Sequence, residues 1–247
     1  MKRMPLLLAF ALAAALAAVL GCDSLPGRPD PAERYQRPSE VEDFALLYAT
    51  HCSGCHGAEG QNGPATNLGD PLYAALADPG ELRRVIARGV AGTPMPVFAR
   101  QRGGTLTPKQ IDILAEGLKA GLNGSEPAAR LGAAPPLVAE AGLGGSASVA
   151  QLASGQRAYA NFCARCHGGA GTGGASGGSL LEPAFLGLVS DQGLRTTVIV
   201  GRQDLGMPGW RGAGERAMTA AEVTDVVAWL GSHRLPPGDA APGASIK

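Results

Sequence analysis

Two distant segments of the chain carry apolar residues at the same helical spacing. The apolar positions are Ile111, Leu114 and Leu118 in the first segment, and Val223, Val226 and Leu230 in the second. Because residues three and four apart share one face of a helix, each segment predicts an amphipathic helix. Thr107 with Gln110, and Thr219 with Glu222, have the spacing of a capping box. The two helices are therefore predicted to begin directly after the threonines.

The rest of the pattern is also helical. Ser39 and Glu42 have capping-box spacing and predict a helix that opens there. Its apolar face would contain Val41, Phe44, Ala45, Tyr48 and Cys52. Shorter helices are predicted around residues 81–88 and 194–201, and no segment alternates apolar and polar residues in the manner of a strand. The predicted fold class is all-α.

The chain is an internal duplication. The sequence around Cys52 matches the sequence around Cys163 at an offset of 111 residues, and from Asp70 onward the offset is 112. The matches include Pro71 with Pro183, Tyr73 with Phe185, Leu76 with Leu188, Leu82 with Leu194, Arg83 with Arg195, Gly89 with Gly201 and Met95-Pro96 with Met207-Pro208. The predicted order is a domain at 39–122, an Ala-, Gly- and Pro-rich linker at 123–150, a second domain at 151–235 and a flexible tail at 236–247.

Composition favours a large buried cofactor and gives no support for a nucleic-acid partner. A domain of roughly 85 residues is marginally stable alone, and only 4% of the residues are aromatic, so a large buried cofactor would help to fill each core. The formal net charge is zero, which gives no indication of nucleic acid or of any strongly charged partner.

Four of the five cysteines form two matched pairs. Cys52 and Cys55 are followed by His56, and Cys163 and Cys166 are followed by His167. Cys-x-x-Cys-His is the attachment pattern of c-type haem. The two thiols form thioethers to the haem vinyl groups, and the imidazole of the next residue is the proximal iron ligand. A zinc site, a disulfide or a redox-active pair would also use paired cysteines, but none of these explains a His after both pairs. The sequence therefore predicts two covalently bound haem c groups.

The N-terminus has the pattern of an export signal. Lys2 and Arg3 precede an apolar run that is too short to span a membrane and fits a signal peptide, residues 1–21. The run ends at Gly21-Cys22, which resembles a bacterial lipoprotein signal and predicts that Cys22 carries lipid. The alternatives are a signal peptide with a chance cysteine and an uncleaved short anchor. Residues 22–38 would then be a polar tether, and the protein would be lipid-anchored to the cell membrane, facing the periplasm.

The sixth position on each iron separates electron carriers from enzymes. Met95 and Met207 occupy matched loops and are each followed by Pro, which favours them as distal ligands over simple gap-filling. Met218 precedes a capped helix and is expected in the core. His51 and His233 are poor candidates, since the first lies beside its own haem motif and the second has no counterpart in the first copy.

Each copy resembles a class I cytochrome c domain, in which an N-terminal helix ends in Cys-x-x-Cys-His and a Met-Pro loop precedes a C-terminal helix. The resemblance implies that His56 and His167 are proximal ligands and that Met95 and Met207 are distal ones. In that family a Pro carbonyl often orients the proximal His. Pro64 is the candidate in the first copy, and the second copy has no equivalent. Arg83 and Arg195 are either partners of the haem propionates or ordinary exposed helix residues.

The resulting functional hypothesis is one-electron transfer by a membrane-anchored two-haem cytochrome. The protein would be a subunit or accessory carrier of a respiratory or photosynthetic complex, between a quinol-oxidising complex and a terminal oxidase or other acceptor. The alternatives are a two-haem peroxidase-like or other small-molecule redox enzyme, and a redox or gas sensor. Both require a displaceable axial ligand, which the matched methionines disfavour.

Overall fold

The computed structural model describes residues 35–124, 131, 134–139, 146–212 and 215–235. By its internal contacts the chain divides into two units, Met1–Glu40 and Val41–Lys247. The described part of the first unit contains one 3-10 turn, η3 (Pro38–Glu40), and an ion pair between Arg37 and Glu40. The predicted signal peptide, Cys22, most of the tether and the tail lie outside the described residues, and they stay predictions.

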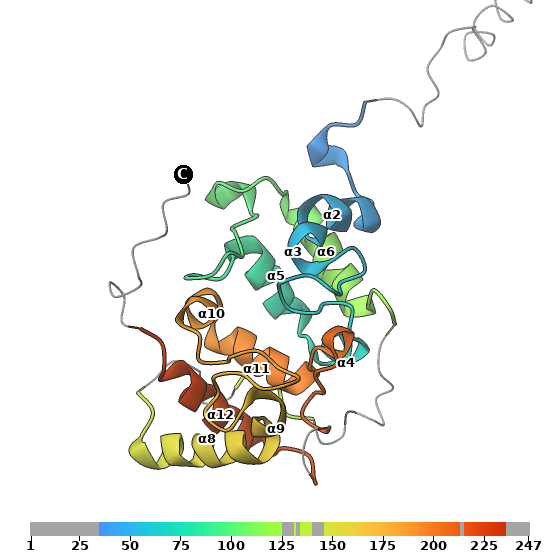
Figure 1. Cartoon of the computed structure of the whole chain (residues 1–247). Helices are drawn as coiled ribbons and strands as arrows, with labels where there is room; N and C mark the ends of the chain where they lie inside the picture. The colour runs from blue at the N-terminus through green and yellow to red at the C-terminus, as the bar shows by residue number, and fades with distance from the viewer. Residues whose placement is uncertain (1–34, 125–130, 132–133, 140–145, 213–214, 236–247) are drawn as a thin grey trace, which may run out of the picture. The chain divides into compact units, whose positions relative to one another are not determined.

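The second unit consists of helices and loops. Its described residues contain isolated bridges but no β-strand, which confirms the all-α prediction. Residues 39–122, here called the first copy, contain α2 (Phe44–His51), α3 (Ser53–His56), α4 (Pro71–Leu76), α5 (Pro79–Arg88), η4 (Arg100–Arg102) and α6 (Pro108–Ala120). Residues 151–235, the second copy, contain α9 (Ala164–His167), α10 (Pro183–Leu188), α11 (Asp191–Val200), η5 (Gln203–Leu205), α12 (Ala220–Gly231) and most of α8 (Val149–Phe162), as Figure 1 shows.

The two late capping boxes are present, whereas the first is not. Thr107 caps α6 and Thr219 caps α12, each with the reciprocal side-chain bond from the third helical residue. Helix α2, however, begins at Phe44 and not after Ser39. Asp43 is its N-cap, because its carboxylate accepts the backbone N–H of Leu46 at 2.7 Å. The helix therefore begins one turn later than predicted, because Asp43 and not Ser39 accepts a free backbone N–H at its start.

In each copy the first and last long helices cross at a point where a glycine of one helix packs against an aromatic residue of the other. Helix α8 crosses α12 where a Cβ on Gly155 would lie 2.1 Å from the backbone oxygen of Asp225 and 2.7 Å from Cβ of Trp229. Helix α2 crosses α6 where a Cβ on Gly117 would lie 2.2 Å from the ring of Phe44. In the second copy the glycine is on the first long helix, α8, whereas in the first copy it is on the last helix, α6. Both copies therefore pair a glycine with an aromatic ring at the crossing, but the two residues have exchanged helices.

Part of the predicted linker belongs to the core of the second copy. Leu137 and Ala139 are buried, and Arg195 of α11 is only 1% exposed. The guanidinium of Arg195 donates to the carbonyls of Pro136 and Leu137 and to the hydroxyl of Thr224, at 2.8–3.1 Å. Helix α8 also begins before the predicted domain boundary, at Val149.

No helix within the described residues has the length and apolar character needed to cross a membrane. The structure therefore offers no spanning segment in that part of the chain.

Candidate functional site

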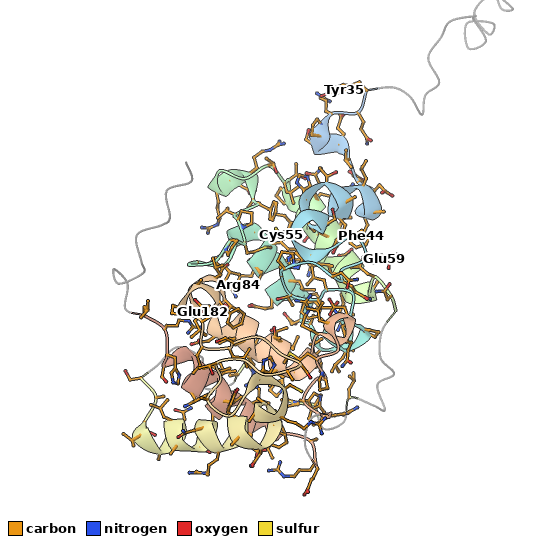
Figure 2. The ribbon with its side chains drawn as sticks, viewed as in Figure 1. Tyr35, Phe44, Cys55, Glu59, Arg84 and Glu182 are labelled. Carbon is orange, nitrogen blue, oxygen red and sulfur yellow. The ribbon has the colours of Figure 1, made fainter. Side chains whose placement is uncertain are left out.

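Both haem motifs lie on the same local structure. Helix α2 ends at His51, Cys52 caps it, and the single turn α3 carries Cys55 and His56. In the second copy Cys163 caps α8, and α9 carries Cys166 and His167. Figure 2 labels Phe44 of α2 and Cys55 of α3. The structure therefore brings the two thiols and the imidazole of each motif onto one continuous pair of helices.

Each motif histidine is held by a backbone carbonyl. Nδ1 of His56 lies 2.8 Å from the carbonyl oxygen of Thr66, and Nδ1 of His167 lies 2.8 Å from that of Gly178. A carbonyl oxygen only accepts, so Nδ1 carries the proton and Nε2 keeps its lone pair for a metal. Burial lowers the pKa of His56, which favours the neutral imidazole that a metal requires.

These bonds correct one prediction and answer a question that the resemblance left open. The carbonyl that orients His56 belongs to Thr66 and not to Pro64, because the loop passes its second carbonyl beyond the proline toward the ring. In the second copy Gly178 supplies the carbonyl without any proline. The chain passes close to this ring, since a Cβ on Gly177 would lie 2.7 Å from the imidazole of His167.

A buried tyrosine fixes the end of each motif. The hydroxyl of Tyr48 donates to the carbonyl of Gly57 at 2.9 Å, and that of Tyr159 donates to the carbonyl of Gly168 at 2.6 Å. Each glycine directly follows the motif histidine, so the hydroxyl ties the first long helix to the turn after the ligand. Burial raises the pKa of Tyr48 to about 12, which keeps this donor protonated.

Tyr159→Phe is expected to reduce the free energy of unfolding of the second copy by about 1 kcal/mol, because the carbonyl of Gly168 loses its donor while the ring still packs. Tyr48→Phe should do the same in the first copy. Guanidinium unfolding followed by circular dichroism measures the loss. Tyr35 is 84% exposed, so Tyr35→Phe is the matched control and should change nothing measurable. Equal midpoints for the Tyr159 and Tyr35 variants would contradict this role.

The thiols do not have the properties of a redox pair. Burial raises the pKa of Cys52 and of Cys163 to about 11, whereas a reactive dithiol requires a lowered value. None of the four motif cysteines forms a disulfide in the structure. Among the described residues, no three His, Cys, Asp or Glu side chains gather in a way that would hold a metal ion such as zinc.

The two methionines come from loops that are packed against the end of a preceding helix. Gly89 ends α5 and Gly201 ends α11, both with positive φ. A Cβ on Gly89 would lie 2.6 Å from the carbonyl oxygen of Met95, and one on Gly201 would lie 2.8 Å from that of Met207. Only glycine permits this approach. The matched loops are thus placed by matched glycines, and the role of the methionines as distal ligands stays a prediction.

The remaining candidates have other partners. Met218 is buried in the hydrophobic core, as expected. His233 packs edge-on against Trp229 and bonds its carbonyl, while His51 packs against Phe98.

The two matched arginines differ in their surroundings, and Arg83 is the partly exposed helix residue that was one of the two expectations. Arg83 forms salt bridges to Asp112 at 2.6 Å and Glu116 at 3.0 Å, which tie α5 to α6. Arg195 is buried among carbonyls, so it is not an exposed helix residue. Both guanidinium groups have protein acceptors in the structure, and a role as propionate partners stays a prediction.

A cavity of about 570 Å³ lies beside the second methionine loop. Its lining includes Asn67 and Leu72 of the first copy and Ile199, Pro208 and Trp210 of the second. The indole Nε1 of Trp210 is buried and has no hydrogen-bond partner among the described residues. An unpaired buried donor costs about 1–3 kcal/mol, and a haem carboxylate is an acceptor of the kind it lacks. The cysteine and histidine donor set and the fixed imidazoles fit a covalently bound haem, whereas the cavity lining includes none of the residues of either haem motif.

Comparison with known families supports the same interpretation through one match. The family model described as cytochrome c oxidase, cbb3-type, subunit III matches residues 39–116 and again residues 150–230. No curated protein matches the sequence. Among solved structures, a chain of the reducing HAO-like protein complex of Kuenenia stuttgartiensis is similar at 20% identity and a TM-score of 0.45. The match covers 82% of this chain and all of that one.

Proposed function

The chain belongs to the family of cytochrome c oxidase, cbb3-type, subunit III, as a tandem c-type cytochrome, and from this membership we propose that it transfers single electrons through two haems. The observation that carries the proposal is the repeated histidine geometry. In both copies Nδ1 is bonded to a carbonyl at 2.8 Å, so both copies present Nε2 for coordination. A chain with one functional site would not need to keep this arrangement twice.

The residues of the chain hold and shield each metal centre. Cys52, Cys55, Cys163 and Cys166 are the four covalent attachment points. His56 and His167 would hold the iron, and Met95 and Met207 would be the second ligands that exclude small molecules. When bound, haem supplies a one-electron Fe(III)/Fe(II) couple, which a thioether ligand places at higher potential than a second imidazole would. The protein itself then makes and breaks no bonds, in contrast to an enzyme.

An optical redox titration of the matured protein tests the proposal. Two low-spin haems, both with the near-infrared methionine-to-iron band and neither binding carbon monoxide, are expected. A haem that is high-spin, lacks the band or binds carbon monoxide readily would overturn the carrier function and favour a peroxidase-like enzyme or a gas sensor. A pyridine haemochrome assay of the same sample counts the haems, and a value of one per chain would contradict the two-haem assignment.

The proposed setting is the periplasmic face of a cell membrane. The lipoprotein-type sequence at Cys22 supports anchoring by acyl chains, each buried methylene adding about 0.8 kcal/mol. The redox partners proposed are a membrane quinol-oxidising complex as donor and a terminal oxidase or other acceptor. A tethered carrier would search for both along the membrane surface.

Cys22→Ser is expected to release the protein from the membrane, because the acylated side chain is lost while both haem motifs are untouched. The measurement is the distribution of haem between the membrane and soluble fractions after the periplasm is opened, together with incorporation of labelled palmitate. Asp23→Asn is the control and should leave the protein in the membrane fraction. Absence of labelled palmitate from the unmodified protein would contradict lipid anchoring.

A further inference from the structure

A hairpin of the second copy touches the loop that orients the first histidine. The methionine hairpin, residues 202–207, is closed by two backbone hydrogen bonds of 2.9 Å between Arg202 and Met207. The histidine loop, residues 62–67, follows the first haem motif and includes Thr66, whose carbonyl holds His56. Both segments lie in the unit that begins at Val41.

Asp204 and Arg202 connect these two segments. Oδ2 of Asp204 accepts the backbone N–H of Asn62 at 2.8 Å, and Oδ1 accepts the side-chain amide of Asn67 at 3.3 Å. Arg202 donates from Nε and Nη2 to the same carboxylate, at 3.0 Å and 2.8 Å. Its Nη2 also donates to the carbonyl of Gly63 at 2.8 Å. We name this set of contacts the Arg202–Asp204 clamp.

The clamp is a buried charge pair on a short, otherwise exposed turn. The side chain of Asp204 is 0% exposed, although Gln203 and Leu205 on either side of it are exposed. A buried carboxylate is stable only when it is paired and hydrogen-bonded. Hydrogen bonding to Arg202 holds the pKa of Asp204 well below its ordinary value, at about 2, so the carboxylate is ionised at neutral pH.

The receiving loop is shaped for this contact. Asn62 has a φ of 62° and is the single non-glycine residue with positive φ in the described part of the chain. Side chains disfavour that conformation, which here directs the backbone N–H at Asp204. Asn67 is 3% exposed and directly follows Thr66, and its side-chain oxygen accepts the N–H of Gly69 at 3.0 Å. One amide side chain thus joins Asp204 to the segment that holds His56.

The duplication does not repeat the clamp. At the offset of 112 residues, Val90 stands where the second copy has Arg202, and Gly92 stands where it has Asp204. The first copy therefore has no charged side chains at these positions with which to hold the loop around Gly178. Within the described residues, a clamp of this kind is therefore present at the first histidine site and not at the second.

We propose that Asp204 is a positioning residue for the first iron site, acting across the copies through Asn62 and Asn67 on the carbonyl that orients His56. The hairpin that carries Met207 and the loop that carries the partner of His56 then move as one body. The inference rests on the proposed binding of haem at both motifs. Its consequence is that the electronic structure of the first haem depends on a residue of the second copy.

Electron paramagnetic resonance of the oxidised, matured full-length protein tests this, because the g values of a low-spin haem follow the orientation of its axial ligands. Met95→His identifies the signal of the first copy. Asp204→Ala is expected to shift or broaden that signal, whether or not it also changes the signal of the second copy, whose proposed ligand Met207 lies on the same hairpin. Should Asp204→Ala not yield matured protein, Asp204→Asn carries the same expectation, since it keeps the shape but leaves Arg202 without its counter-charge.

Asp191→Ala is the matched control, because it breaks a partly buried ion pair, with Arg234, that touches neither histidine loop. It should shift neither signal. An unchanged first signal in the Asp204 variants, or a change confined to the second signal, would overturn the positioning role. An unmodified protein without two low-spin haems would instead refute the proposed function, so the two failures are distinguishable.

Discussion

Met207→His is expected to lower the midpoint potential of one haem by roughly 0.2 V. This is a fraction of the range of about 0.8 V over which axial ligands set the reduction potentials of haems. A thioether stabilises Fe(II) relative to Fe(III), and an imidazole removes that preference. The other haem should keep its potential, because its ligands are untouched. The measurement is an optical redox titration, in which half of the near-infrared methionine band should also disappear.

Two further variants make this result specific. Met95→His should lower the potential of the other haem by a similar amount. Met218→Leu is the control, because Met218 is buried in the core and the first copy has Leu106 at the same position. It should change neither potential. A Met207→His protein with both original potentials would show that Met207 does not bind iron, and the loop placed by Gly201 would then need another explanation.

Features determined by local sequence were predictable. The capping boxes at Thr107 and Thr219 are satisfied within one turn, and the structure has both. The all-α class followed from the same helical spacing. The start of α2 was predicted wrongly because two acceptors, Ser39 and Asp43, lie close together, and only the backbone path decides which one caps the helix.

Features that depend on distant backbone were not predictable. The carbonyls of Thr66 and Gly178 orient the two histidines, and a backbone acceptor leaves no mark on residue type. The partners of Arg195 are carbonyls of the linker, 58 or 59 residues away along the chain. The buried tyrosines did leave a signal, since each stands four residues before the first cysteine of its motif. Their hydroxyl partners became visible only in the structure.

Gly155→Ala is expected to lower the free energy of unfolding of the second copy by about 1–2 kcal/mol, as the net result of two opposed effects. Overpacking costs about 1–3 kcal/mol in a tight core, and here the obstacle is the backbone oxygen of Asp225, 2.1 Å from the added Cβ. Alanine regains up to about 1 kcal/mol of helix propensity. Gly117→Ala meets the ring of Phe44 and not backbone, so it should cost less. Guanidinium unfolding measures both.

The exchanged glycine and aromatic ring also predict a rescue. Phe44 aligns with Gly155, and Gly117 aligns with Trp229, so the double variant Phe44→Gly, Gly117→Trp gives the first copy the arrangement of the second. Gly117→Trp alone places two rings in one space, and Phe44→Gly alone leaves a cavity; each should be strongly destabilising. The double variant should be more stable than the sum of the two losses predicts, by an interaction energy within about 0.5–3 kcal/mol. Simple additivity would show that the crossing of α2 and α6 does not depend on this complementary pair.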